Sequence, residues 1–306
     1  MPTTANQELN VRRYSKQFID MIQAVFGYMS YFTDFFAGGI EALDGVQHNA
    51  VAFSVKTSDI PLVINPNYNT DPNVAFGTGT SNSNRFGNRK EIIYIDTDVP
   101  YAWGWSFHEG IDRYTVNNAP DAAIADRLEI HSRDMTRKFN AQHSKFIASI
   151  AGQTLPLATY TETDVIALFD ALYAYFLNIE AVGQKVIKVN AALYNALVNS
   201  KIATTLKNST VNIDGNILPM FKDFAIQAIP DNMLTIPGTG GGNYSAYAYI
   251  TNVGKAFTGI TTVRTIQSED FDGVALQGAG KAGEFIIEDN KKAVVKVTAP
   301  VPDPGV

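Results

Sequence analysis

The clearest hydrophobic pattern in the chain lies between residues 121 and 150. Large apolar side chains recur there at steps of four and seven residues, which places them along one face of a helix. Acidic residues gather early and basic residues late, an order that complements the helix dipole, and Gly152 follows as a terminator. We predict one helix of about thirty residues, roughly 45 Å long, which suits an extended subunit. Its apolar face comprises Ile124, Leu128, Met135, Phe139, Phe146 and Ile150.

Two segments with the alternation of β-strands precede this helix. The first is AVAFSVKT at 50–57, and the second is KEIIYIDTDVPYAWGWSF at 90–107. About thirty residues rich in Asn, Gly, Ser, Thr and Pro separate them, more than compact domains usually leave without structure. We expect a two-stranded arm that projects from the body. Because an isolated hairpin is marginal in water, a neighbouring copy is its natural support. A mobile surface loop is the alternative.

The rest of the chain mixes helix and strand patterns, which is typical of an α+β or α/β protein. Thr163 is placed to cap a helix, a shorter helix is expected over 191–201, and another near 15–30. The apolar face of the helix after Thr163 comprises Val165, Ile166, Phe169, Leu172, Tyr173 and Phe176. Strands are expected over 185–190, 224–229, 244–251, 261–267, 284–290 and 291–297.

The composition narrows the functional classes. Charged residues make up only 18% of the 306 positions, which favours a subunit that stays in contact with others. The net charge of −6 argues against a dedicated nucleic-acid binder. No cysteine occurs, which excludes disulfides, thiolate nucleophiles and zinc–thiolate sites. The N-terminal segment lacks the apolar core of a signal peptide and no apolar run is long enough to span a membrane, so we expect a soluble protein made in the cytoplasm.

One glycine-rich segment, at 278–283, matches the G-x-G-x-x-G pattern of dinucleotide-binding loops. That fingerprint requires a strand before it and a helix after it, whereas a predicted strand follows here. We interpret the segment as a flexible glycine turn between strands.

Other candidates for chemistry also fall short. His131 and His143 lie too far apart on one helix to chelate a single metal, and His108 lacks the second histidine of a helical zinc motif. Adjacent carboxylates do not place two carboxyl groups across one pocket. Trp103 and Trp105 face the same side of a predicted strand, where a core or subunit contact is favoured over sugar or base binding. We expect no enzyme, no cofactor and no metal site.

Two runs near the C-terminus carry a family resemblance. They are DFDGVALQGA at 270–279 and EFIIEDNKKAVVKV at 284–297, supported by KVIKVN at 185–190 and by Ile-Pro-Asp at 229–231. These runs resemble the C-terminal signature of major capsid proteins from tailed phages of Gram-positive bacteria. The resemblance implies the α+β Hong Kong 97-type capsid fold, with an N-terminal arm, an extended two-stranded loop, a peripheral domain built on a long spine helix, and an α/β axial domain.

The resemblance also implies where these parts lie in the chain. The arm would occupy 1–30, the extended loop and the start of the peripheral domain 31–115, and the spine helix 116–155. The axial domain would occupy 156–258, and the closing strands of the peripheral domain 259–306.

The implied function is assembly into pentamers and hexamers of an icosahedral head that encloses double-stranded DNA. The implied partners are further copies of the chain, a separate scaffolding protein, a portal, and packaged DNA contacted non-specifically, without a membrane. The implied location is the virion, assembled in the host cytoplasm. Contacts between subunits are expected at Arg12, Arg13 and Tyr14 of the arm and at Phe76, Arg85 and Phe86 of the loop.

The chain departs from some members of that family in two ways. Some begin with a long helical scaffolding segment, for which little room exists before the predicted loop, so a separate scaffold is expected. Some members join their subunits covalently through a Lys–Asn isopeptide bond, whose formation a buried Glu assists. Lys56 and Lys90 are available, but no residues match that triad, and we predict no cross-link.

Three other functions are weighed against the coat protein. An encapsulin-type shell shares the fold but encloses cargo enzymes. A soluble enzyme would use 58–88 as a large lid over a pocket lined by convergent polar groups. A phage tail-tube or connector subunit conflicts with the long predicted helix.

Overall fold

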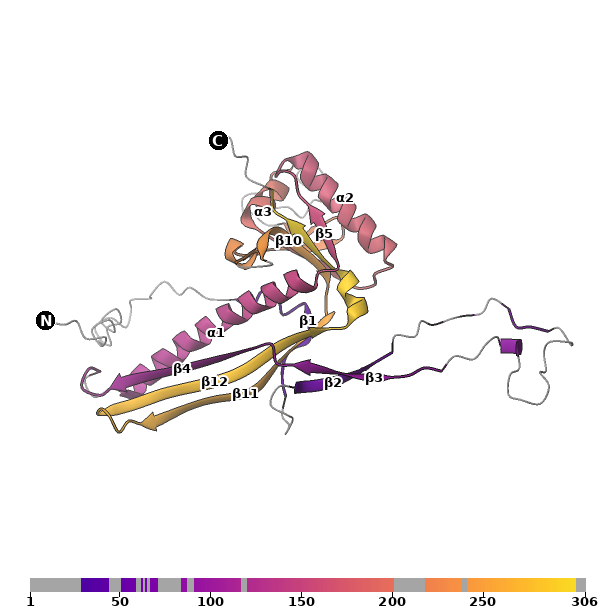
Figure 1. Cartoon of the computed structure of the whole chain (residues 1–306). Helices are drawn as coiled ribbons and strands as arrows, with labels where there is room; N and C mark the ends of the chain where they lie inside the picture. Colours follow the sequence, from indigo (N-terminus) through magenta and orange to yellow (C-terminus); the bar gives the residue numbers. More distant parts are fainter. Residues whose placement is uncertain are drawn as a thin grey trace, which may run out of the picture. The chain divides into compact units, whose positions relative to one another are not determined.

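The chain is organised into two units (Figure 1). The body contains the described residues up to Leu43 and from Ala102 onward, and the ribbon unit contains those between Gly45 and Tyr101. The computed structural model describes residues 29–43, 51–58, 62, 64, 67–70, 84–86, 91–116, 120–200, 218–237 and 241–300. None of the helices in these ranges is long and apolar enough to cross a membrane.

A four-stranded sheet in the order β1-β11-β12-β4 carries the long helix α1 along one face (Figure 1). β11 and β12 form a long antiparallel hairpin, β4 pairs antiparallel with β12, and β1 runs parallel to β11. The bounds are β1 Phe36–Ala42, β4 Trp103–Asp112, β11 Gly254–Gln267, β12 Gly273–Ile286 and α1 Pro120–Ile150. With 31 residues, α1 confirms the predicted rod.

Glycines of β12 make room for an aromatic layer between this sheet and α1. A Cβ atom at Gly278 would lie 2.3 Å from the Phe107 ring, and one at Gly280 would lie 2.6 Å from the Trp105 ring. These two rings stack on each other, and the Phe107 ring stacks on His131 of α1 at 4.0 Å. The predicted turn at 278–283 is therefore wrong. The glycines lie inside a strand because bulky rings on β4 leave no space for side chains.

The second sheet has the order β5-β13-β10-β6-β8-β7, and β9 pairs with one end of β10. The bounds are β5 Gln153–Pro156, β6 Lys185–Val189, β7 Met220–Phe221, β8 Phe224–Ala228, β9 Thr235–Ile236, β10 Gly242–Ile250 and β13 Val294–Thr298. Three further helical segments accompany it: α2 Glu162–Asn178, α3 Ala191–Val198 and the 3₁₀ turn η4 Asp231–Met233, while η5 Glu288–Ala293 leads into β13.

This second sheet is buried on both faces. On one face, α2 and α3 pack the side chains of Phe169, Leu172 and Leu193 against the strands. On the other face, the aromatic segment before β1 packs against Tyr247 and Tyr249 of β10. Strands covered on both sides read as continuous apolar runs, as in residues 244–250, which are all buried.

α1 presents a different face to this core from the one that hydrophobicity predicts. The predicted stripe from Ile124 to Ile150 is only half-buried, whereas the buried face holds Asn140, His143, Ser144, Ile147 and Ala148. The side chain of Asn140 accepts a hydrogen bond from the Tyr31 N–H at 3.0 Å and donates one to the Met29 carbonyl at 2.7 Å. Polar residues are tolerated on the buried face because the neighbouring backbone satisfies them.

Three local predictions need correction. The segment at 90–107 is not one strand, because β3 ends at Pro100 and β4 begins at Trp103. The residue that caps α2 is Thr161 rather than Thr163. The glycine at position 152 is required by close packing and not only by the end of α1. A Cβ atom there would lie 2.6 Å from the Lys291 carbonyl oxygen. The helix expected near 15–30 lies outside the described residues.

The ribbon unit is built on two antiparallel strands, β2 Val51–Thr57 and β3 Ile95–Pro100. The Ser54 hydroxyl donates a hydrogen bond across them to Asp98 at 2.5 Å. A 3₁₀ turn, η3 Asn84–Phe86, lies in the long connection, where the Asn69 N–H donates to the Arg85 carbonyl at 2.9 Å. The paired strands agree with the sequence prediction.

The aromatic layer gives the first testable prediction. Replacing Gly280→Val forces a side chain into the Trp105 ring, so the free energy of unfolding should fall by about 1–3 kcal/mol. The matched control is Ala279→Val, since Ala279 is exposed on the opposite face of the same strand. Urea denaturation of unassembled subunits, followed by tryptophan fluorescence, measures both. Equal stability of the two variants would contradict the packing described here.

Candidate assembly surfaces

The first polar contact between α1 and its sheet centres on Glu109 of β4. Its carboxylate accepts hydrogen bonds from Arg127 Nε at 2.6 Å and Nη2 at 2.8 Å, and lies 3.0 Å from His131 Nε2. The hydrogen bonds from Arg127 hold the pKa of Glu109 below its usual value of 4.5. This carboxylate therefore fastens the middle of α1 in its ionised form.

The second contact centres on Glu284 of β12. Its carboxylate accepts a hydrogen bond from the Trp103 indole N–H at 3.2 Å and lies 2.9 Å from His143 Nδ1. The side chains of Glu284 and His143 are 3% and 7% exposed. Both helix histidines are thus partnered by carboxylates. No cluster of three His, Asp or Glu side chains fit to hold a metal occurs in the part of the chain that the structure describes.

A buried lysine ties the start of the body to the second sheet. Lys188 of β6 is 2% exposed and donates a hydrogen bond to Asp34 at 2.7 Å, and the Tyr249 hydroxyl donates to the same carboxylate at 2.9 Å. Burial lowers the pKa of Lys188, while Asp34 opposes that shift. Because removal of one partner would leave a buried charge, the contact fixes the segment before β1 in place.

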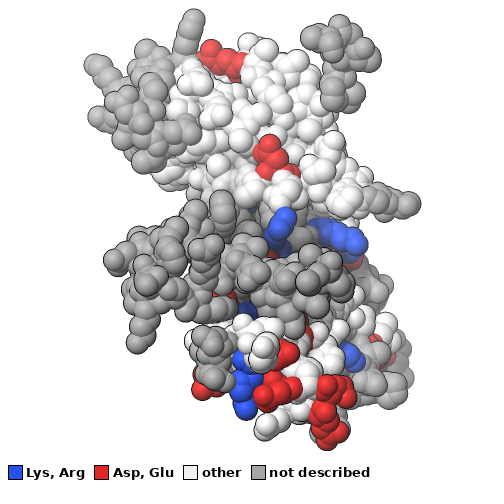
Figure 2. All heavy atoms as spheres, turned by 90° about the vertical axis from the view of Figure 1, so that its left-hand side faces the viewer, with Lys and Arg blue, Asp and Glu red and all other residues white. Residues whose placement is uncertain are grey.

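Charged side chains are unevenly distributed over the face of the molecule that Figure 2 shows. In Figure 2 the upper part of the molecule, where the second sheet and its helices lie, is mostly white. Lys, Arg, Asp and Glu residues gather towards the lower end of the same view. On the face seen in this view, the described surface of the second sheet and its helices is therefore poor in charge.

The ribbon unit leaves large apolar side chains in water. Residues 92–95 are four consecutive apolar side chains, each more than half exposed, and Leu62 and Ile64 are 86% and 81% exposed. Soluble monomers rarely leave contiguous apolar groups uncovered, so such a surface marks an interaction site. The sequence analysis missed this surface because it assigned KEIIYI to a strand. Four consecutive apolar residues do not alternate as a half-buried strand does, and this pattern could have indicated the exposed surface.

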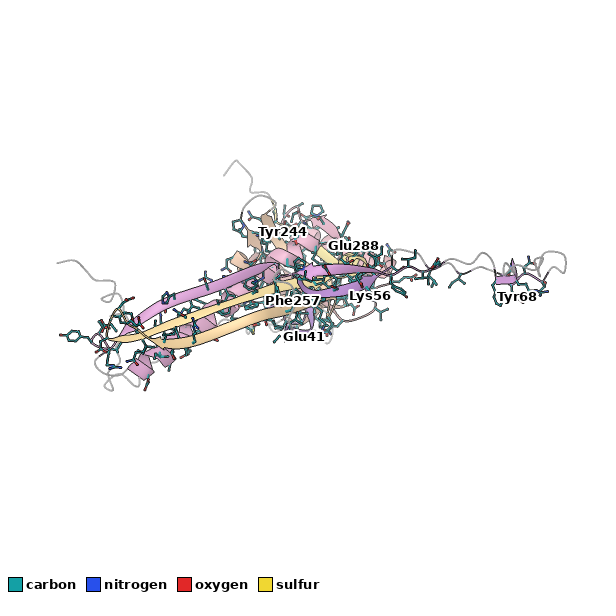
Figure 3. All side chains as sticks on the ribbon, turned by 60° about the horizontal axis from the view of Figure 1, so that its bottom comes forward. Glu41, Lys56, Tyr68, Tyr244, Phe257 and Glu288 are labelled. Atoms are coloured by element: carbon teal, nitrogen blue, oxygen red, sulfur yellow. The ribbon has the colours of Figure 1, made fainter. Side chains whose placement is uncertain are left out.

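Six residues were predicted from the sequence to make contacts between subunits, and the structure describes two of them. Arg12, Arg13, Tyr14 and Phe76 lie outside the described residues. Arg85 and Phe86 come together in η3: Phe86 is 75% exposed and contacts the Tyr68 ring edge-on at 5.0 Å, and the Arg85 guanidinium lies 5.7 Å from the centre of that ring. Tyr68, labelled in Figure 3, belongs to the same connection of the ribbon unit as η3.

The lysine considered for a covalent link lies on β2. Lys56, labelled in Figure 3, has a side chain that is 74% exposed and lies 4.0 Å from Asp96 of β3. Lys90 lies outside the described residues. The absence of a cross-link stays a prediction.

The comparisons with known proteins establish the fold. No protein-family model and no curated protein matches the chain. A chain of the capsid structure of the cyanophage P-SCSP1u is 11% identical with a TM-score of 0.68, covering 94% of each chain. A chain of the mature capsid of bacteriophage PhiM1 is 11% identical with a TM-score of 0.65, covering 90% of this chain and 89% of that one. A chain of the capsid of Myoviridae phage XM1 is 12% identical with a TM-score of 0.54, covering 95% and 97%.

The chain therefore has the Hong Kong 97-type capsid fold, and the predicted fold class is confirmed. The five domain ranges and the resemblance to capsid proteins from phages of Gram-positive bacteria remain predictions.

The contact at Glu109 yields a prediction on pH. Because the folded-state pKa of Glu109 is lowered, its contribution to stability is present above the unfolded-state pKa and is lost as the pH falls through the folded-state value. Glu109→Gln should lower the free energy of unfolding at pH 7 by about 1 kcal/mol. This loss is smaller than for a fully buried contact, because the Glu109–Arg127 pair is partly exposed. Wild type and variant should converge well below pH 4.5.

The control for this prediction is Glu129→Gln, which removes an exposed pair with Arg133 one turn apart. It should cost less than about 0.5 kcal/mol at any pH. A Glu109→Gln effect that stays constant from pH 7 to the acid range would contradict the role given to the ionised carboxylate.

Proposed function

We propose that this chain is the major capsid protein of a tailed double-stranded DNA phage, which assembles into pentamers and hexamers of an icosahedral head. The observation that carries the proposal is the fold, shared over nearly the whole of this chain and of the phage capsid chains. An encapsulin-type shell is not favoured, because the structures that support the fold come from phage capsids.

The exposed apolar residues of the ribbon unit support self-assembly. Residues 92–95, together with Leu62, Ile64 and Phe86, would rest on a neighbouring copy and lose their contact with water there. Burial of apolar area stabilises by about 25 cal/mol per Å², and permanent interfaces bury several thousand Å². Arg85 and Tyr68, which contact each other, would lie with Phe86 in the same interface.

The remaining contacts and partners belong to the same proposal. An N-terminal arm around Arg12, Arg13 and Tyr14 would be a second tie between subunits. A separate scaffolding protein and a portal would guide assembly in the host cytoplasm, and the mature protein would reside in the virion. Contact with packaged DNA would be local and non-specific, in keeping with the net charge of −6.

An enzyme with a lid loop finds no support in the described residues. His131 and His143 are partnered by Glu109 and Glu284 in the contacts that fasten α1, and His108 lies 3.2 Å from the Gln277 side chain. The lowered pKa of Glu109 follows from its hydrogen bonds with Arg127, and the lowered pKa of Lys188 follows from burial of its side chain. The proposal accordingly contains no catalytic step and no cofactor.

Assembly through the ribbon gives the test of the proposed function. Ile93→Asp places a charge in the centre of the exposed apolar run, so the yield of closed particles should fall by about tenfold or more. Electron microscopy and sedimentation velocity measure the yield. Far-UV circular dichroism should remain unchanged, because Ile93 is 59% exposed in the subunit.

The matched control is Ile287→Asp, an isoleucine of the body that is 47% exposed. Particles should form with this variant. Full assembly of the Ile93→Asp protein would refute the role of the ribbon, and a wild-type protein that stays monomeric would refute the proposed function itself.

A further inference from the structure

A small apolar groove lies at one edge of the second sheet, between β5 and α2. Its volume is about 290 Å³, and its lining includes Leu155, Leu157, Ala167 and Ala171. A cavity of roughly 150 Å³ holds a group the size of benzene, so this groove has room for about two aliphatic side chains. Asp164 is the one charged residue in the lining. We call this feature the groove.

An apolar projection lies at the other end of α2. Tyr173, Leu177 and Val182 are 43%, 62% and 93% exposed. We call these three residues the knob. Val182 is held by a defined turn, since the Ala181 N–H donates to the Phe176 carbonyl at 3.1 Å and Gly183 has a φ of 135° that favours glycine. The knob is therefore presented in a fixed position.

The groove and the knob lie on opposite flanks of α2. Ala171 lines the groove and Tyr173 belongs to the knob, and two residues are separated by about 200° around a helix. The groove flank faces β5, the first strand of the sheet order. The knob flank faces the opposite end of the sheet, because Lys185 of β6 lies 5.5 Å from the Tyr173 ring and Lys222 beside β7 pairs with Asp170.

We propose that the groove of one copy receives Leu177 and Val182 of the next copy around a ring. This inference rests on the proposed function and specifies how neighbouring copies meet within a pentamer or hexamer. An interface between two different patches of the same protein repeats head to tail, and it closes into a ring when the rotation allows. A groove and a projection on opposite flanks of one helix have this arrangement.

The observations favour a second copy over the chain's own C-terminal segment. That segment, 301–306, lies outside the described residues, but Thr298 lies beside the groove, because the Leu157 N–H donates to its carbonyl at 3.3 Å. The segment carries Asp303, however, which would bring a second carboxylate towards Asp164. The knob of a second copy would bring apolar side chains to the groove and no carboxylate. Lys185 and Lys222, which lie beside the knob, pair with Asp223 and Asp170 of their own copy.

Site-specific cross-linking tests the inference, since the chain has no cysteine. The double variant Ala171→Cys with Val182→Cys is assembled and treated with a short bismaleimide, and the products are separated in denaturing gels. The expected result is a ladder of linked subunits that ends at five and six. Each single variant should give no ladder, because a groove-to-knob contact brings two different positions together.

A matched cysteine pair and a substitution in the knob complete the test. Ala171→Cys with Ile287→Cys should give no ladder, since Ile287 is exposed but belongs to neither feature. Val182→Asp should reduce the yield of particles by about tenfold or more, while circular dichroism stays unchanged.

Each outcome decides between the two claims. Wild-type particles without a ladder from the groove-and-knob pair would overturn the inference and leave the proposed function standing. A ladder that appears only after removal of 301–306 would show that the chain's own end fills the groove, which also overturns it. A wild-type protein that forms no particles would refute the proposed function instead.

Discussion

The packing of α1 against β4 and β12 is the interaction on which the body depends. Glycines at 278 and 280 let the rings of Phe107 and Trp105 lie flat over the strand, and those rings fill the space beneath the helix. Two carboxylates, Glu109 and Glu284, then fasten α1 by hydrogen bonds at separate points along its length. The result is a long helix attached along a long sheet, which stiffens the body.

Both units leave apolar side chains exposed that assembly would cover. The ribbon unit exposes residues 92–95, and the second sheet's helix α2 exposes the knob. Neither surface is needed for the cores around Phe169 or Tyr247, which are complete within one copy. In a shell, neighbouring subunits would cover both surfaces. The low content of charged residues agrees with a subunit that stays in permanent contact with other copies.

The sequence predicted the long helix and the paired strands of the ribbon because hydrophobic periodicity acts locally, and the family resemblance near the C-terminus predicted the fold class. It failed where partners come from distant parts of the chain. The G-x-G-x-x-G run looked like a turn since nothing local reveals that Trp105 and Phe107 lie above it. The buried face of α1 was misplaced because Asn140 and His143 become acceptable there only through Tyr31 and Glu284.

The central claim is that copies of this chain close into a shell, and electron cryo-microscopy of the purified wild-type protein tests it most directly. The account predicts closed polyhedra in which the ribbon unit of each subunit lies against an adjacent subunit. A population of dispersed monomers, with residues 92–95 packed against their own body, would contradict it.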